Sequence, residues 1–425
     1  MSKIKIKNFG PIKEGMLDND GRIDIKKVTV FIGNQGSGKS TVAKLISTFM
    51  WLEKALIRGD MKAPVSYQDF IELIEFHRIE NYLEPNTQIE YEGATYLLKL
   101  VGNANSGKKI IEATKLNSKA VKLPKIMYVP AERNFLSSIE NINKVSDLIV
   151  GSLKNYSVEF RNAQLAYKNK AIELPINNTK IVYDPKDNEN YLEFDGKRLR
   201  LSHASSGFHS IVPLHWITRY LVDFVKQGEK KLLELLSTDQ TVRRNNELKE
   251  LNMLRLDEKE LRSREKKINE KYVCKYFVNI VEEPEQNLFP SSQRLLLNSL
   301  LSYNNGNNML IMTTHSPYLI NYLTLAIQAE YLLNKINKLP DNLNDDAVKY
   351  NLGDKTLKER LNEIVPVDSV VSAIDVVIYE LDEKEGIIKR LETYEGIPSD
   401  KNFLNRSLAD GNKFFDALLE IEEEL

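Results

Sequence analysis

The stretch "VFIGNQGSGKST" at residues 30–41 decides the fold predicted for this chain. It fits the spacing G-x-x-x-x-G-K-S/T, with Gly33, Gly38, Lys39 and Ser40 at the fixed positions. The apolar run before the loop indicates a buried strand, and the pattern after it indicates a helix. A glycine loop between strand and helix lets backbone N–H groups surround phosphate oxygens at the N-terminus of the helix. The sequence therefore predicts a nucleoside-triphosphate site in an α/β fold.

The loop also carries side chains suited to a metal-bound triphosphate. Lys39 would bring a positive charge to the β- and γ-phosphates, and the Ser40 hydroxyl would bind Mg²⁺. The candidate nucleotide-binding residues are Asn34, Gln35, Gly36, Ser37, Gly38, Lys39, Ser40 and Thr41.

Two adjacent carboxylates follow a second apolar run, in "NIVEEPE" at residues 279–285. A triphosphate site needs a carboxylate at a strand end for Mg²⁺ and a group that orients the attacking water. Glu282 suits the first role and Glu283 the second. Acidic residues also follow strands simply because turns are polar, but the phosphate loop favours the catalytic interpretation.

His315 ends a third apolar run, "MLIMTTHSP" at residues 309–317. A single histidine is more often structural than catalytic. At a strand end beside a triphosphate site, its imidazole could reach the γ-phosphate. The other histidines and the one cysteine show no metal-ligand spacing.

Composition limits the class of protein. The 425 residues are 42% hydrophobic and carry a net charge of −1. A protein that coats nucleic acid is usually strongly basic, so this net charge argues against that class. The net charge still allows a local basic patch. The single cysteine, Cys274, excludes an intrachain disulfide framework. We see no secretory signal and no apolar run near the roughly 20 residues that span a bilayer. We expect a soluble, cytoplasmic protein without a membrane partner.

Residues 243–271 differ from the rest, because 17 of these 29 residues are charged and none is Gly or Pro. Leu254, Leu261 and Ile268 recur every seven residues, but charged residues stand between them, which indicates a solvated helical projection rather than a strong coiled coil. The acidic "DNLNDD" at 341–346 is interpreted as a polar loop. The predicted division is a head at 1–228 and 273–330, a charged helical insert at 229–272 and a C-terminal α/β extension at 331–425.

In this order, the motifs resemble those of the ABC-class ATPases. "GNQGSGKST" resembles Walker A, "FVNIVEEPE" Walker B, and "TTHSP" the switch-histidine loop, while "ASSGFHS" at 204–210 lies where the signature belongs. The resemblance implies an α/β ABC-type P-loop ATPase head, with a mixed sheet, flanking helices and an antiparallel lobe. It also implies that ATP and Mg²⁺ bind, and that two copies pair around two ATP molecules. Ser205, Ser206 and Gly207 would then contact the ATP held by the other copy.

The sequence departs from the family pattern in places. Glu282 replaces the usual aspartate, His209 stands where glutamine is more frequent, and we identify no Q-loop glutamine. Two interpretations remain open for "YVPAERNF" at 128–135: Glu132 and Arg133 lie near the nucleotide, or the segment is a plain strand-to-helix turn.

The compact insert and the strings "IKIKNFGPIKEG" and "EEPEQNLFP" resemble the OLD/RecF-like branch, here without a Toprim domain. Similar proteins are ATPase subunits of the prokaryotic anti-phage systems PARIS and Septu. The resemblance implies a homo-oligomer that controls a separately encoded effector, expected to be a nuclease. Two alternatives stay open: a RecF-like DNA-repair ATPase that binds DNA, and a scaffold that binds ATP with very slow turnover.

Overall fold

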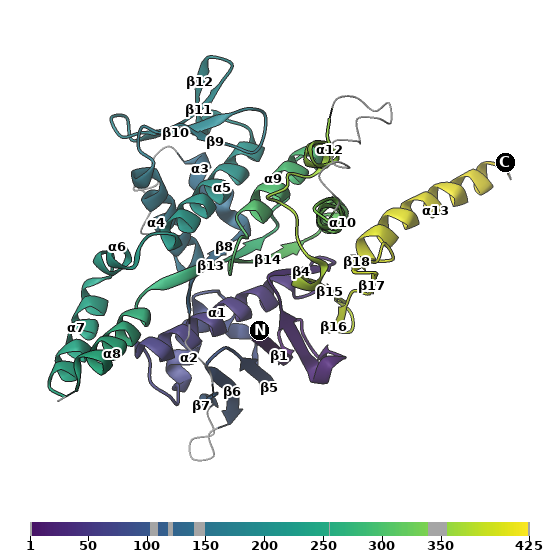
Figure 1. Cartoon of the computed structure of the whole chain (residues 1–425). Helices are drawn as coiled ribbons and strands as arrows, with labels where there is room; N and C mark the ends of the chain where they lie inside the picture. Colours follow the sequence, from purple (N-terminus) through teal and green to yellow (C-terminus); the bar gives the residue numbers. More distant parts are fainter. Residues whose placement is uncertain are drawn as a thin grey trace.

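The structure, a computed structural model, describes residues 2–102, 109–117, 122–139, 149–254, 256–338 and 355–423. Its centre is a seven-stranded mixed sheet in the order β2-β16-β15-β4-β14-β13-β8 (Figure 1). The strands are β2 (Gly15–Met16), β4 (Val28–Gly33), β8 (Leu123–Val129), β13 (Cys274–Glu282), β14 (Met309–Thr314), β15 (Val376–Leu381) and β16 (Ile387–Arg390). The five strands from β15 to β8 run parallel, so their carboxyl ends meet at one edge.

The central strands are apolar on both faces because helices or a second sheet cover each face. In β13, Phe277 and Val281 belong to one hydrophobic core, and Val278 and Ile280 belong to the other. This alternation follows from the two-residue period of a strand. It explains the continuous apolar runs in the sequence, which are typical of parallel strands buried on both sides.

Four helices pack on one face, and two helices with an antiparallel sheet pack on the other. The first face packs α4 (Gly151–Ala166), α5 (Ser206–Val225), α9 (Pro290–Ser302) and α10 (Pro317–Ile336). The second packs α1 (Lys39–Arg58), α2 (Tyr67–Glu75) and the sheet β3-β1-β5-β6-β7. That sheet comprises β1 (Ser2–Phe9), β3 (Arg22–Ile25), β5 (Leu83–Glu92), β6 (Tyr96–Gly102) and β7 (Lys109–Lys115).

Two hairpins follow the alternating patterns of their sequences. Strands β5 and β6 pair antiparallel. Strands β10 (Lys180–Asp184) and β11 (Glu189–Phe194) pair antiparallel around a polar turn, between β9 (Ile172–Glu173) and β12 (Lys197–Arg200). Helix α3 (Phe135–Ser138) follows β8 and precedes α4, with residues 140–148 outside the described ranges.

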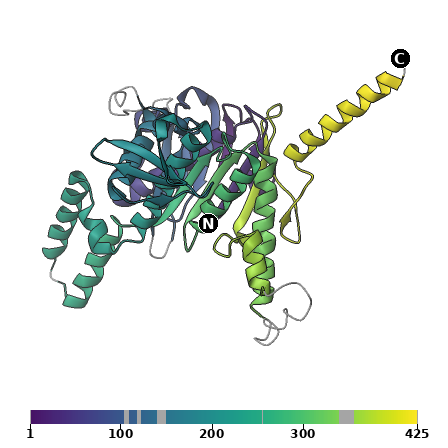
Figure 2. The same cartoon turned by 90° about the horizontal axis from the view of Figure 1, so that it is seen from above.

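The charged segment forms a short helical hairpin that projects from the head (Figures 1 and 2). It consists of α6 (Glu229–Glu234), α7 (Thr238–Asn252) and α8 (Glu258–Glu270). Helix α8 buries no residue, and α7 buries only Leu251. Polar contacts hold the pair together, including Arg244 Nε to Asn269 Oδ1 at 2.7 Å. The observed hairpin matches the solvated projection expected from the charge pattern.

The C-terminal region adds strands to the central sheet. Strand β15 pairs in parallel with β4, and β16 pairs with β15 and with β2 near the other end of the chain. The predicted boundary at residue 330 therefore falls within a unit that the sheet makes continuous. The cause is that "VVIYEL" is an ordinary buried strand whose partner, β4, lies far away in the sequence. The "DNLNDD" loop lies outside the described residues.

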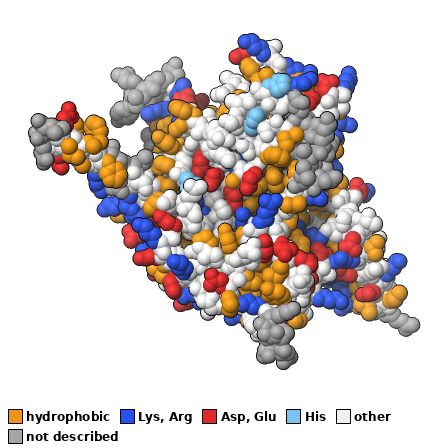
Figure 3. Space-filling model, turned by 180° about the vertical axis from the view of Figure 1, so that it is seen from behind, with side chains coloured by type: hydrophobic (Ala, Val, Ile, Leu, Met, Phe, Trp, Pro, Cys, Tyr) orange, Lys and Arg blue, Asp and Glu red, His pale blue; other side chains and the backbone are white. Residues whose placement is uncertain are grey.

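The chain then continues through α12 (Leu357–Ile364), which precedes β15, and through β17 (Thr393–Tyr394), β18 (Ile397–Pro398) and α13 (Phe403–Glu423) after it. Helix α13 extends away from the head in both ribbon views (Figures 1 and 2). Its far half carries exposed apolar side chains, visible as the hydrophobic cluster on the projecting arm in Figure 3: Phe414, Phe415, Leu418, Leu419 and Ile421. None of the described helices combines the length and the apolar character needed to cross a membrane.

Candidate nucleotide site

The phosphate loop joins β4 to α1 at the carboxyl edge of the sheet. Gly38 has a φ of 96°, a left-handed conformation that favours glycine, and helix α1 begins directly after it. A Cβ on Gly33 would come within 2.4 Å of the Leu381 carbonyl of β15, so only glycine fits beside that strand. No side chain caps the start of α1, so its first N–H groups stay available for an anion.

Lys39 is buried within this loop, at 5% exposure. Its Nζ donates to the carbonyls of Gly33 at 2.9 Å and Asn34 at 2.7 Å. Burial lowers the pKa of Lys39 to about 8, and nearby carboxylates, with Glu283 first, oppose that change. The ammonium therefore lies in a position where an added anionic phosphate would stabilise its charge.

The remaining loop residues surround the same space. Asn34 donates through Nδ2 to Glu383 at 3.0 Å and accepts from the Gln35 amide at 2.8 Å. Ser37 is 2% exposed, and its Oγ has no hydrogen-bond partner among the described residues. A buried hydroxyl without a partner is costly, so this atom fits a loop that closes on a polar ligand. Thr41 lies buried in the first turn of α1, between the loop and the core.

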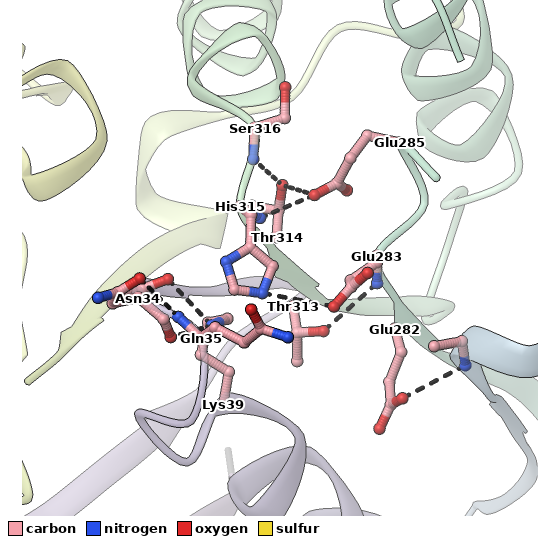
Figure 4. A network of polar contacts seen from close by, with 12 residues as sticks. Asn34, Gln35, Lys39, Glu282, Glu283, Glu285, Thr313, Thr314, His315 and Ser316 are labelled. Atoms are coloured by element: carbon pink, nitrogen blue, oxygen red, sulfur yellow. Dashed lines mark hydrogen bonds and ion pairs between the residues drawn. The ribbon is translucent and has the colours of Figure 1, made fainter. Parts of the chain in front are cut away.

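Glu283 has a strained backbone and a histidine partner. Its φ is 43°, which is uncommon for a residue other than glycine, and its N–H donates to the Thr313 carbonyl at 2.9 Å. Its Oε1 lies 3.4 Å from Nε2 of His315, so the two predicted catalytic residues meet (Figure 4). The hydrogen bond from His315 lowers the pKa of Glu283, against the opposing effect of burial.

Glu282 points away from Glu283 and is almost fully buried (Figure 4). Its carboxylate accepts from the Tyr128 hydroxyl and from the Ala131 amide at 3.3 Å, and Lys44 Nζ lies 4.0 Å away. Burial raises the pKa of Tyr128, which keeps its hydroxyl as a donor. Donors from β8 and the loop after it thus hold this carboxylate in place at the end of β13.

Glu285, which the sequence analysis did not single out, orients His315. Its Oε1 accepts from the His315 amide at 2.7 Å and from the Thr314 hydroxyl at 2.8 Å (Figure 4). Burial raises the pKa of Glu285, and its second oxygen is buried without a partner among the described residues. The only signal in the sequence was its place as the third glutamate of "VEEPE".

The contacts of Arg133 show where the "YVPAERNF" segment lies relative to the carboxylates. Its side chain is fully buried and donates to the carbonyls of Glu282 at 2.7 Å and Glu283 at 2.6 Å. Its Nε also donates to the Ser210 carbonyl of α5 at 3.3 Å. Arg133 therefore lies behind the carboxylate pair and links it to the last residue of the signature-like segment, Ser210 in α5. Glu132 lies in the short helical turn between β8 and Arg133.

The signature-like segment forms the start of α5. Ser205 is the N-cap residue, Ser206 opens the helix, and both are exposed. A Cβ on Gly207 would lie 3.1 Å from the Asn287 carbonyl, so this turn packs closely against the loop after Glu285. His209 Nε2 lies 2.8 Å from the Leu201 carbonyl, which gives this histidine a local structural contact.

The described residues contain no group of three or more His, Cys, Asp or Glu that could hold a metal ion. Mg²⁺ in triphosphate sites usually needs only one or two protein ligands, since phosphates and waters complete its shell. Ser40 at the first turn of α1 and Glu282 at the end of β13 would supply an oxygen ligand each, and the uncapped helix, Lys39 and Ser37 suit a triphosphate.

A phosphate loop at the carboxyl edge of a parallel sheet, with a histidine after the adjacent strand β14 and carboxylates after the next strand, β13, is typical of the P-loop ATPase class of protein. The chain belongs to the AAA_23 family, described as an AAA domain, whose model matches residues 3–273. The family match and the layered mixed sheet confirm the predicted α/β ABC-type P-loop fold.

Solved structures with a similar chain course include three SMC head domains. The head bound to the C-winged helix domain of ScpA aligns with a TM-score of 0.38 and 10% identity, covering 92% of this chain and 96% of that chain. The head from Thermotoga maritima gives 0.35 and 11%, with 92% and 98% covered. The Pyrococcus furiosus head with an extended coiled coil, bound to the C-terminal domain of ScpA, gives 0.37 and 9%, with 99% and 100% covered. A comparison with curated proteins finds no match.

Proposed function

We propose that the protein binds ATP with Mg²⁺ and hydrolyses it to ADP and phosphate. The observation that carries this proposal is the meeting of Lys39, Glu283 and His315 at one edge of the sheet, beside the uncapped start of α1. The chain's place in a P-loop ATPase family supports it.

The contacts of the site suggest a role for each residue. Lys39 and the loop amides of residues 34–41 hold the phosphates, and Ser40 and Glu282 serve Mg²⁺. Because the pKa of Glu283 is lowered, its side chain is a carboxylate near neutral pH and can accept a hydrogen bond from the attacking water. His315 donates to Glu283 and would detect the γ-phosphate, while Glu285 holds the backbone of His315.

The variant Glu283→Gln tests the hydrolytic role. It keeps the size of the side chain but removes the charge, so ATP should still bind while hydrolysis falls by about 10²–10⁴-fold. Binding is measured with a fluorescent ATP analogue and hydrolysis by phosphate release. Lys39→Ala is the matched control, because it should lose binding itself. Wild-type turnover in Glu283→Gln would disprove the role, and negligible turnover in the wild type with ATP-dependent assembly would favour the scaffold alternative.

A second copy would complete the site through Ser205, Ser206 and Gly207. The exposed serines at the start of the 20-residue helix α5 support this, because a free helix N-terminus attracts phosphate. Ser205→Arg should spare ATP binding by the monomer and prevent ATP-dependent pairing, as measured by light scattering after gel filtration in Glu283→Gln protein. Pairing that survives Ser205→Arg would contradict this arrangement.

The resemblance to the OLD/RecF-like branch supports a role in prokaryotic anti-phage defence, in which ATP state controls a separately encoded effector, expected to be a nuclease. Copurification with the products of neighbouring genes tests this. A nuclease in the complex would support defence, and a recombination protein would favour the RecF-like alternative.

DNA binding would need a basic surface, and the helical hairpin is the candidate. Several of its basic residues are already paired, including Arg262 with Glu258, Arg264 with Glu260, and Lys271 with Glu247. This pairing favours a solvated hairpin over a DNA-binding stripe. A salt-dependent DNA-binding assay decides, since phosphate contacts weaken steeply with added salt.

A further inference from the structure

A cavity of about 480 Å³ lies between α1, α2 and β8, apart from the phosphate loop. That volume is within the range of about 300–1,000 Å³ usual for small-molecule sites. Its apolar lining consists mainly of Trp51, Met61, Leu73, Phe76, Ile126 and Tyr128. None of the roles proposed above uses this cavity.

Aromatic rings dominate the walls. Trp51 is 43% exposed and Phe76 39% exposed, so two large rings remain open to solvent at this site. The buried His77 ring contacts both Phe76 and Tyr128, with its centroid 4.9 Å from that of Phe76 and 4.6 Å from that of Tyr128. Nδ1 of His77 is buried without a hydrogen-bond partner among the described residues. A buried polar atom without a partner is costly, so His77 suits a cavity that receives a hydrogen-bonding ligand.

The charges at the cavity have one sign. Asp69 and Glu72 of α2 line it, and each accepts a hydrogen bond from an uncharged side chain, Ser66 Oγ at 2.6 Å and Gln68 Nε2 at 3.2 Å. No Lys or Arg is among its described lining residues. Carboxylates without cations disfavour phosphates and other anions, whereas aromatic faces and carboxylates together attract organic cations.

The floor of the cavity reaches the nucleotide site. The Tyr128 ring packs on His77, and its hydroxyl donates to the carboxylate of Glu282. Ser47 and Thr48 line another wall and belong to α1, the helix that begins at Lys39. A molecule that shifts these walls therefore acts on both elements that hold Mg²⁺ and phosphate.

We propose that this cavity binds a small organic cation with an aromatic body, and that its occupancy changes the rate of ATP hydrolysis through Tyr128 and Glu282. The regulatory part rests on the ATPase function proposed above, whereas the binding part stands without it.

Three probes that share a phenyl ring and differ in charge test the binding part: 2-phenylethylamine, 2-phenylethanol and phenylacetate. Trp51 reports binding by its fluorescence, since the only other tryptophan, Trp216, is fully buried. The amine should bind about tenfold more tightly than phenylacetate, a difference of about 1.4 kcal/mol, with the alcohol between them. Absence of amine binding, or equal binding of phenylacetate, would overturn the proposal.

A double variant, Asp69→Asn with Glu72→Gln, tests the source of the selectivity. Both residues are exposed, so the exchange should leave the fold intact and reduce the affinity for the amine to that for the alcohol. Glu75→Gln is the matched control, because Glu75 is an exposed carboxylate of the same helix that does not line the cavity. An equal loss in the control would show a general charge effect and refute the site.

Tyr128→Phe tests the coupling. It keeps the ring at the cavity but removes the hydroxyl that reaches Glu282. Amine binding should persist, while the effect of the amine on hydrolysis, expected to be at least about twofold in the wild type, should disappear. Binding without any effect on hydrolysis in an active wild type refutes the coupling alone. A protein that binds the amine but hydrolyses no ATP refutes the proposed ATPase function and leaves the cavity assignment standing.

Discussion

Arg133 holds the main chain of the two candidate carboxylates. Its guanidinium is fully buried, and it donates hydrogen bonds to the carbonyl oxygens of Glu282, Glu283 and Ser210. Burial lowers the pKa of Arg133, but the group keeps its charge, because arginine does not lose its proton in proteins. The left-handed backbone at Glu283 therefore has a charged side chain bound directly to its carbonyl.

Arg133→Met should remove these bonds and leave buried carbonyls without donors. We expect the free energy of unfolding to fall by about 3 kcal/mol, because buried polar groups without partners are costly. Hydrolysis should fall as well, since Glu283 loses its support. Denaturant unfolding measures the first effect and phosphate release the second. Arg262→Met on the exposed face of α8 is the control and should change stability by about 0.5 kcal/mol or less. Equal effects of the two variants would contradict this role.

Two buried histidines make stability depend on pH. Burial lowers the pKa of His77 to about 3 and that of His215 to about 4. The unfolded chain protonates these side chains below about pH 6.5, where the folded chain does not. The free energy of unfolding should therefore decrease as the pH falls from about 6.5 toward 4, by up to about 1.4 kcal/mol per pH unit for each histidine.

Urea unfolding at several pH values measures this dependence. In His77→Gln, one proton fewer is taken up on unfolding, so the slope between about pH 6 and pH 4.5 should decrease by about half the contribution of the pair. A slope identical to that of the wild type would show that His77 is protonated in the folded protein.

At the scale of residues, a motif with fixed identity and spacing was enough to predict where the candidate residues lie. The phosphate loop, Glu283 and His315 each follow an apolar strand, as predicted, and the structure brings Glu283 and His315 together. Glu285 and Arg133 were not predictable, because their roles depend on partners that only the fold brings near: the backbone of His315 for Glu285, and the carbonyls at the end of β13 for Arg133.

Among the elements, the hairpin α7–α8 is the most separable. Its charge pattern predicted a solvated projection, and the structure buries none of α8. Strand β15 shows the opposite case. Its apolar run gave no sign that it pairs with β4 instead of a nearby strand, since the register of parallel strands is set by packing across the whole sheet.

Replacement of residues 238–270 by a flexible Gly-Ser linker should therefore leave the head folded. The replacement leaves the buried residues Tyr272 and Val273 in place. It removes helices that bury only Leu251. We expect the thermal unfolding temperature and basal ATP hydrolysis to stay near wild-type values, as measured by circular dichroism and phosphate release. Loss of a copurifying partner or of DNA binding in this variant would then assign that surface. A collapse of the fold would mean that the hairpin supports the head.

For the whole molecule, strands that lie more than 300 residues apart in the sequence, such as β2 and β16, belong to one sheet. The amide of Lys13 donates to the Gly386 carbonyl at 3.0 Å, and Asn34 of the phosphate loop contacts Glu383. The turn between β15 and β16 thus lies beside the phosphate loop, although more than 300 residues separate them in the sequence.

Truncated chains test whether β15 and β16 are part of the head or lie beyond a domain boundary at residue 330. A chain that ends at residue 330 lacks β15 and β16 and exposes the edge of β4, so it should be insoluble or fail to bind ATP. A chain that ends at residue 407 loses only the projecting part of α13 and should bind ATP like the full chain. Soluble, ATP-binding protein from the shorter version would restore the boundary at 330.

Because β15 lies next to β4, the nucleotide site can be completed only after β15 has been synthesised. A ribosome makes the phosphate loop more than 300 residues before the strand that flanks it, residues 376–381. During synthesis at about 5–20 residues per second, the loop waits many seconds for its neighbour. Unfinished chains therefore present an open strand edge and an incomplete nucleotide pocket, so an aborted translation product should be a substrate for chaperones rather than an unregulated ATPase.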